Sequence, residues 1–270
     1  SRSSSAAATE ESTPPGPRVG DPNAGHRYRL SFEKIGPVAL LGHLDLVREL
    51  PRIFRRLGVR QIYTGGYNPK PHVVFGPALS LGSMSLAELV DVRLEERFEG
   101  EALTELLARM NAASPDGLTF VAGELLPKGA DSVNNAIDEA HYLIGVDKRV
   151  ATELGVMESA VLGERCAKVM AATELPIVRR KGRRKLARKI DLRPFLRALA
   201  PADPDLVSTT LSRVGIRGEL VWVDARVAIG PSGSAKTSEI AGLVFASWDD
   251  PPPHRTIRIG LGHGAPADDT

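Results

Sequence analysis

The strongest constraint on the fold is the order in which strand-like and helix-like patterns of hydrophobic residues follow one another in the first half of the chain. Apolar residues first alternate with polar ones, as Tyr28, Leu30 and Phe32 do, and then recur with the spacing of an amphipathic helix. The periods run strand, helix, strand, strand, helix, strand, which is the order of a ferredoxin-like sandwich. The stretches that carry them are 27–36, 43–58, 72–79, 86–96, 100–113 and 117–127.

Side-chain spacing predicts which face of these elements is buried. The strand expected at 86–96 places its largest apolar residues on one face, and these are Val90, Val92 and Leu94. The helix expected at 43–58 contains Pro51, which should kink it or mark a start within it. Its buried face is predicted to carry Leu44, Val47, Phe54 and Leu57.

The second half of the chain resembles a degraded repeat of the first. Strand patterns occur at 141–146, 175–180, 188–196 and 218–230, and helical patterns occur near 161–172 and 236–246. We therefore predict an α+β fold of tandem ferredoxin-like (βαββαβ) sandwiches, the second degraded. The expected organisation is a disordered tail or linker at 1–26, domains at 27–127 and 141–248, a connector at 128–140 and a tail at 249–270, with a short strand at 255–259.

Composition limits the class of protein. The chain is 42% hydrophobic and 25% charged, as globular domains are, and no run of eighteen apolar residues occurs. With no signal-peptide pattern either, we expect a cytoplasmic protein without membrane contact. The single cysteine, Cys166, lies in a helical pattern, where a buried, unreactive thiol is expected. One cysteine cannot hold an iron–sulfur cluster, so no cofactor is expected in this chain.

A basic run in the second half is the first candidate site. Residues 179–189 contain eight cations in eleven positions around Gly182, which is placed as a hairpin turn. Such a run either keeps an edge strand soluble or forms a footprint for a polyanion such as RNA. The net charge of the whole chain is only +2, so the basic surface is local. The candidate nucleic-acid-binding residues are Arg179, Arg180, Lys181, Arg183, Arg184, Lys185, Arg188 and Lys189.

A loop rich in glycine and proline is the second candidate site. Residues 64–82 contain four glycines and three prolines, a mixture that specifies one backbone path. Tyr67 is either a stacking residue in a binding loop or an apolar wedge in a structural corner. Asp45 is either a ligand contact or a partner of the helix N-terminus. If residues 64–72 of this loop meet the start of the first helix at one end of the sheet, the substrate-binding residues are His43, Asp45, Tyr67, Asn68, Lys70 and His72.

The segment "GPSGSAKT" at 230–237 has the outline of a phosphate-binding loop. That motif needs glycine directly before its lysine, and here Ala235 precedes Lys236. We therefore interpret the segment as a turn, with Ser234 or Thr237 as the cap of the last helix.

Several ordered segments together resemble a known family. They are "LSFEKIGPVALLGHLDLVREL", "GGYNPKPHVVFGPALSLG", "AELVDVRL", "KIDLRPFL" and "VAIGPSGSAKTSEI". This order is similar to that of the radical-SAM-linked family, a domain of unknown function that is fused behind, or encoded beside, a radical SAM enzyme in many bacteria. The resemblance covers about residues 27–246. It implies an accessory role, with the iron–sulfur cluster and SAM held by the partner protein.

Three functions remain open from the sequence. The first is a noncatalytic domain that binds RNA or a ribonucleoprotein, such as a ribosome-related assembly, and presents it to the radical SAM partner. The second is a metal-independent ribonuclease, by analogy of fold with CRISPR RNA-processing endonucleases, in which His43 is the general acid or base and Lys70 stabilises the phosphorane. The third is a protein–protein adaptor that does not touch nucleic acid.

Overall fold

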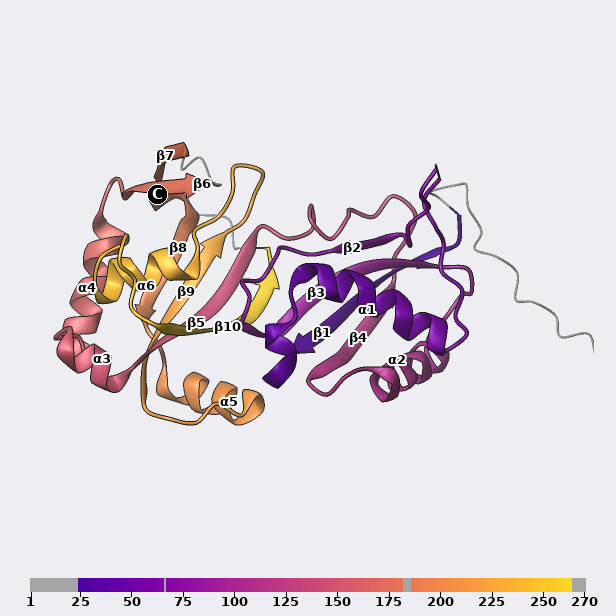
Figure 1. Cartoon of the computed structure of the whole chain (residues 1–270), viewed down its shortest axis with the longest axis horizontal. Coiled ribbons are helices and arrows are strands. Elements are labelled where there is room, and N and C mark those ends of the chain that lie inside the picture. The colour runs from indigo at the N-terminus through magenta and orange to yellow at the C-terminus, as the bar shows by residue number, and fades with distance from the viewer. Residues whose placement is uncertain (1–23, 66, 182–185, 264–270) are drawn as a thin grey trace, which may run out of the picture.

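The computed structural model describes residues 24–65, 67–181 and 186–263. The predicted α+β class is confirmed, because a large, mostly antiparallel sheet of eight strands packs with six α-helices (Figure 1). The elements are β1 (His26–Lys34), η1 (Gly36–Leu40), α1 (His43–Arg56), β2 (Val73–Phe75), β3 (Met84–Leu94), α2 (Glu101–Ala113), β4 (Leu118–Leu125), β5 (Glu139–Asp147), α3 (Lys148–Glu153), α4 (Ser159–Ala171), β6 (Pro176–Lys181), β7 (Leu186–Asp191), η2 (Arg193–Phe195), β8 (Leu196–Pro201), α5 (Pro204–Val214), β9 (Leu220–Ala228), α6 (Thr237–Phe245) and β10 (His254–Gly262).

The first half of the sheet has the strand order β4-β1-β3, with β2 paired to β3, and every neighbouring pair is antiparallel. One face carries alternate residues of these strands and is covered by α1 and α2, which together form one apolar core. The predicted buried face of β3 is confirmed, since Val90, Val92 and Leu94 are at most 1% exposed. Period-two spacing predicted the buried face of β3 correctly because only one face of this strand packs against helices.

The predicted buried face of α1 is partly wrong. Leu44 is 67% exposed and Val47 is also exposed, whereas Leu46, Leu50 and Ile53 are buried with Phe54. Leu44, Leu46 and Val47 are all apolar, so spacing alone did not identify the arc that faces the sheet. The helix continues through Pro51, which is itself buried.

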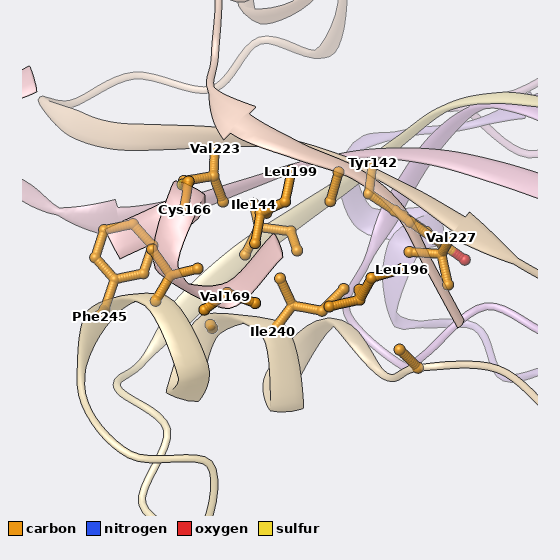
Figure 2. Close-up of a cluster of buried hydrophobic side chains, with 14 of the residues drawn as sticks. Tyr142, Ile144, Cys166, Val169, Leu196, Leu199, Val223, Val227, Ile240 and Phe245 are labelled. Atoms are coloured by element: carbon orange, nitrogen blue, oxygen red, sulfur yellow. The ribbon is translucent and has the colours of Figure 1, made fainter. Parts of the chain in front are cut away.

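The second half of the sheet has the strand order β10-β5-β9-β8, again with antiparallel neighbours. Helices α4 and α6 cover one face, where Ile144, Cys166 and Phe245 lie in a shared core (Figure 2). Helix α5 packs on the opposite face against Leu143 and Trp222. Burial raises the pKa of the Cys166 thiol to about 11, as expected of an unreactive core cysteine.

Some elements of the second half were not predicted. The stretch expected as one strand at 188–196 divides into β7 and β8 with the short helix η2 between them, and α3 and α5 had no counterpart in the prediction. Strands β6 and β7 form a separate two-stranded ribbon. The sequence therefore indicated most strands of this half but not helices α3 and α5 or the separate ribbon.

Strand β10 joins the two halves. It pairs parallel with β3 through Ile257 and Arg258 and antiparallel with β5 along most of its length. The expected tail at 249–270 thus contains a central strand of the sheet, while residues 264–270 lie outside the described part. The yellow strand in Figure 1 occupies this position between the halves. None of the described helices has the length and apolar character needed to span a bilayer.

The connector expected at 128–140 packs against the first half. Asp91 on β3 accepts two hydrogen bonds from Arg29, at 2.8 and 3.0 Å, and a third from the amide of Val133 at 2.9 Å. Val133 is fully buried. This contact holds the connector against the face of the sheet that carries Arg29 and Asp91.

Candidate functional site

The part of the loop that carries Tyr67, Asn68 and Lys70 lies at the opposite end of the first half from the start of α1. The ring of His43 packs edge-on against Phe75, with 5.4 Å between centroids, and Phe75 pairs with Val90 on β3. The base of the loop is held instead by Arg93, whose amide donates to the carbonyl of His72. His72 precedes Phe75 by three residues, which is roughly 10 Å along an extended strand. Residues 64–70 lie farther from His43 still. The structure therefore does not bring His43 to residues 64–72 as predicted, although His43 contacts the later part of the loop at Phe75.

The loop from Thr64 to Lys70 is closed by its own hydrogen bonds. The Thr64 amide donates to the Lys70 carbonyl at 2.8 Å, and the Lys70 amide donates to the Thr64 hydroxyl at 3.1 Å. Tyr67 is 100% exposed, and Asn68 and Lys70 are exposed beside it. Tyr67 is therefore not an apolar wedge, and its side chain is available to a ligand.

The remaining residues of this predicted site have local structural contacts. Asp45 lies in the first turn of α1, and its carboxylate accepts the Gly42 amide at 2.9 Å, so its role at the helix N-terminus is confirmed. His72 is half-buried at the base of the loop. Burial, together with the positive charge of Arg93, lowers the pKa of His72 below its usual value, so this imidazole is neutral near pH 7.

The basic run lies on the β6–β7 ribbon, and its described members differ in environment. Arg179 forms a bidentate ion pair with the buried Glu239 at 2.7 Å and donates to the Ser234 carbonyl at 2.6 Å. It therefore fixes the ribbon to α6 and is not a free cation for a ligand. Arg188 and Lys189 are exposed on β7. The structure does not describe residues 183–185 or the side chains of Arg180 and Lys181.

A groove runs beside the exposed cations of β7. It has a volume of about 470 Å³, and one wall is formed by Arg188 and Lys189. The opposite wall is formed by the turn that follows β9, including Ile229, Gly230 and Ser232. The basic ribbon is thus next to a concave surface, which is the shape required to hold an extended chain.

A second cavity, of about 300 Å³, lies at the junction of the two halves. Its walls come from the two motifs that the sequence singled out in separate halves, "FGPALSLG" and "GPSGSAKT", and its floor comes from β5 and β10. Ile229 and Gly230 line both this cavity and the groove beside β7, so the two are adjacent. Sequence reasoning missed this site because it interpreted the second motif as a helix cap and expected a short strand within a tail at 255–259, not a central strand of the sheet.

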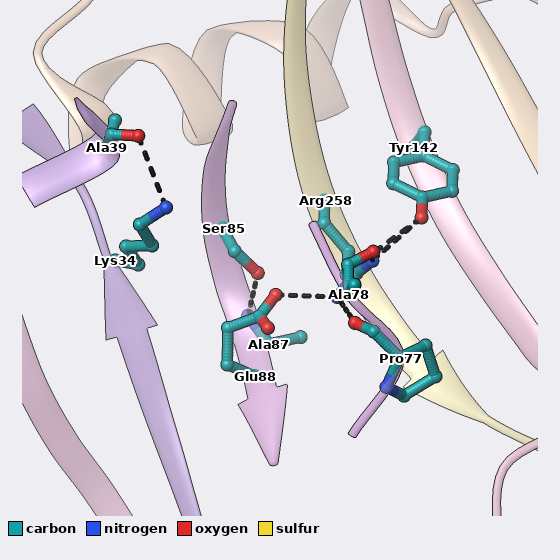
Figure 3. Close-up of polar contacts among 9 residues, drawn as sticks. All are labelled: Lys34, Ala39, Pro77, Ala78, Ser85, Ala87, Glu88, Tyr142 and Arg258. Carbon is teal, nitrogen blue, oxygen red and sulfur yellow. Dashed lines mark hydrogen bonds and ion pairs between the residues drawn. The ribbon is translucent and has the colours of Figure 1, made fainter. Parts of the chain in front are cut away.

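The junction is held together by the buried Arg258 of β10 (Figure 3). Its guanidinium donates to Glu88 at 2.8 Å and to the carbonyls of Pro77 and Ala78 at 2.9 and 3.1 Å. It also donates twice to the hydroxyl of Tyr142, at 2.9 and 3.2 Å. All five guanidinium hydrogens therefore have partners, and Arg258 fixes the segment at 77–78 onto the sheet.

A buried lysine lies close to this cluster. Lys34 is 2% exposed, and its ammonium donates to the Ala39 carbonyl at 3.2 Å. Burial lowers the pKa of Lys34, while the negative charge of Glu88 acts in the opposite direction. Lys34 and Arg258 thus lie on either side of the same carboxylate.

The expected cap of α6 was assigned to the wrong residues. Glu239, and not Ser234 or Thr237, accepts the Lys236 amide, at 2.8 Å. Thr237 instead accepts a hydrogen bond from Thr256 at 3.1 Å, across the cavity floor. The segment is therefore a turn, as predicted, but its hydroxyl groups line the cavity.

These features define an α+β protein with a basic ribbon, a groove and a cavity between two sheet halves. The family described as uncharacterized protein conserved in bacteria (DUF2344) matches residues 27–221. This is well over half of the chain, so the chain belongs to that family. The predicted membership of a domain family of unknown function is confirmed at this level, and the link to radical SAM proteins stays a prediction. No curated protein matches the chain.

Proposed function

We propose that the chain is a cytoplasmic, noncatalytic accessory domain that binds RNA, alone or within a ribonucleoprotein, and presents it to a radical SAM partner. The observation that carries the RNA-binding part is the groove beside β7, where the exposed Arg188 and Lys189 form one wall. Cations along a concave track bind a phosphate backbone without reading its sequence. The partner, with its iron–sulfur cluster and SAM, is inferred from the family resemblance.

The proposal also includes a tandem ferredoxin-like architecture. The strand orders β4-β1-β3-β2 and β10-β5-β9-β8 support it, because both follow the same pattern of antiparallel neighbours. In this interpretation the β6–β7 ribbon and α5 are insertions in the second sandwich. The groove then lies between an insertion and the sandwich that carries it.

The test is binding of a fluorescent single-stranded RNA, measured by anisotropy at low and moderate salt. The double variant Arg188→Ala/Lys189→Ala should weaken binding about tenfold at low salt, or about 1.4 kcal/mol. It should also reduce the dependence of binding on salt, because fewer counterions are released. The matched control is Arg48→Ala/Arg55→Ala on α1, which removes the same charge from the other half. Equal affinity of the β7 variant and the wild type would contradict the proposal.

The ribonuclease alternative receives no support from the geometry, because its two proposed residues, His43 and Lys70, lie at different ends of the first half. The adaptor alternative has an observation of its own. Leu40, Leu44 and Leu81 are 71%, 67% and 69% exposed, and the Gly82 amide donates to the Ala39 carbonyl, which brings their segments together. An apolar surface of this kind suits a protein partner.

The adaptor alternative is tested with the purified radical SAM partner and the variant Leu44→Ser/Leu81→Ser. If the chain is an adaptor, this variant loses the partner, nuclease treatment has no effect, and RNA does not bind. If RNA binds and the β7 variant weakens it, the first function holds, and the apolar surface then serves only partner contact.

A further inference from the structure

The cavity at the junction of the two halves has a one-sided charge. Its charged lining residues are Lys236 and Arg258, both cationic, and no carboxylate lines it within the described part of the chain. Lys236 is exposed at the rim and makes no ion pair with a described residue. The charge of Arg258 is balanced by its ion pair with Glu88 and its hydrogens are all used, so Lys236 is the lining cation that remains for a ligand in the described part of the chain. The cavity is therefore suited to an anionic group.

The lining of the cavity carries hydroxyl groups whose hydrogens are not donated to a described residue. Ser83 is 5% exposed, and its hydroxyl makes no hydrogen bond to any described residue. The Tyr142 hydroxyl accepts two bonds from Arg258, so its own hydrogen remains to be donated. Thr237 accepts from Thr256 and likewise keeps its hydrogen. A bound ligand with several acceptor oxygens would take up these three hydrogens.

This arrangement differs from a phosphate-binding loop that opens a helix. The Lys236 amide at the start of α6 is already occupied by the carboxylate of Glu239, and the bidentate pair with Arg179 neutralises that carboxylate. An anion would therefore be held by side-chain hydroxyls and Lys236, not by the amides of α6. Leu79 and Ile229 add an apolar wall that a sugar or base could contact.

We propose that this cavity binds the phosphorylated terminal nucleotide of the RNA chain that lies in the adjacent groove. The inference rests on the proposed RNA-binding function and adds the chain end that the domain recognises. A phosphate monoester carries more negative charge than an internal phosphodiester and has three acceptor oxygens, so the donors of the cavity distinguish a chain end from the middle of a strand. Because Ile229 and Gly230 line both spaces, one strand can pass from groove to cavity.

The experiment compares one single-stranded RNA in three forms: with a 5′-phosphate, with a 3′-phosphate and with hydroxyl groups at both ends. One phosphorylated form should bind about tenfold more tightly than the hydroxyl form. Lys236→Ala and Ser83→Ala should each reduce this preference at least about threefold while leaving the affinity for the hydroxyl form unchanged. Thermal melting checks that both variants are folded, and Lys128→Ala, at an exposed lysine away from the cavity, is the matched control.

The outcomes separate this inference from the function on which it rests. If all three RNA forms bind equally and the β7 variant weakens them, RNA binding stands and the terminal-phosphate site is refuted. If no RNA binds, the proposed function fails, and calorimetry with adenosine 5′-monophosphate and inorganic phosphate tests the cavity alone. A heat of binding that the wild type shows and Lys236→Ala lacks supports a phosphate site in the cavity. If the wild type shows no heat of binding, the phosphate site is refuted.

Discussion

Removal of the buried guanidinium at the junction should destabilise the protein strongly. Arg258→Met keeps most of the aliphatic stem but removes the ion pair with Glu88 and four further hydrogen bonds. Loss of one partner of a buried pair costs about 3–5 kcal/mol, because the remaining charge is left without compensation. In this variant the positive charge of Lys34 still lies near the Glu88 carboxylate and partly compensates it. We therefore expect the free energy of unfolding to fall by about 3 kcal/mol, near the lower end of this range.

A double-mutant cycle isolates the interaction. Glu88→Met leaves Arg258 as an uncompensated buried cation, whereas the double variant Arg258→Met/Glu88→Met removes both charges of the pair. Lys34 loses the nearby carboxylate equally in Glu88→Met and in the double variant, so this effect cancels in the cycle. We therefore expect the double variant to lose at least about 1–2 kcal/mol less than the sum of the single variants. The free energy of unfolding is measured by urea titration with the fluorescence of Trp222 and Trp248.

Two results would refute this reasoning about Arg258. One is a loss below about 1 kcal/mol in Arg258→Met, which would mean that water or a rearranged side chain replaces the guanidinium. The other is additivity in the cycle. Arg55→Met, at an exposed position of α1, serves as the control and should stay within about 0.5 kcal/mol of the wild type.

Three further predictions concern single groups. Burial lowers the pKa of Lys34 below its ordinary 10.5, so the folded chain holds this proton less tightly than the unfolded chain. The cost of burying the charged ammonium therefore falls as the pH rises towards 10.5, because the folded chain releases the proton first. Urea titrations from about pH 8 to about pH 10 should show a gain in stability that Lys34→Met lacks and Lys128→Met retains. The Cys166 thiol, with its pKa near 11, should react with a thiol reagent only as fast as the protein unfolds, and rapid labelling of the native chain would contradict its burial. Tyr67→Ala/Lys70→Ala should leave the melting temperature within a few degrees, because both side chains are exposed; if the loop binds RNA or the partner, that affinity falls about tenfold, and unchanged binding removes the loop from the site.

The strands of the sheet could be predicted from the sequence because their burial has a simple period. Alternation at Tyr28, Leu30 and Phe32, and again at Val90 and Val92, reports a sheet with helices on one face. The arc of α1 could not be predicted in the same way, since Leu44 and Leu46 are both apolar and only the position of the sheet decides which one is buried. Periodicity identifies the elements, and packing decides their orientation.

The candidate loop illustrates a second limit. The composition of residues 64–82 correctly indicated a fixed backbone path, but a path does not specify its neighbours. The placement of His43 beside Phe75 depends on how α1 packs on the sheet and on the pairing of β2 with β3, neither of which the composition of the loop specifies. The prediction joined two segments on the assumption that both faced the same end of the sheet, and only the register of the strands could test that assumption.

The junction cavity required the longest-range information. Its walls belong to segments about 150 residues apart, and its floor is completed by a strand near the end of the described chain. That strand pairs with β3 over only two residues, so its sequence carried little sign of a central position. Arg258 is nevertheless an informative residue, because a cation that is fully buried in the sheet needs acceptors from both halves. The same requirement fixes the segment at 77–78 above the sheet, and that segment forms one wall of the cavity. Arg258 and Tyr142, which hold the two halves together, therefore also shape the proposed phosphate site, and their loss would affect folding. Binding can be tested separately from folding with Lys236 and Ser83.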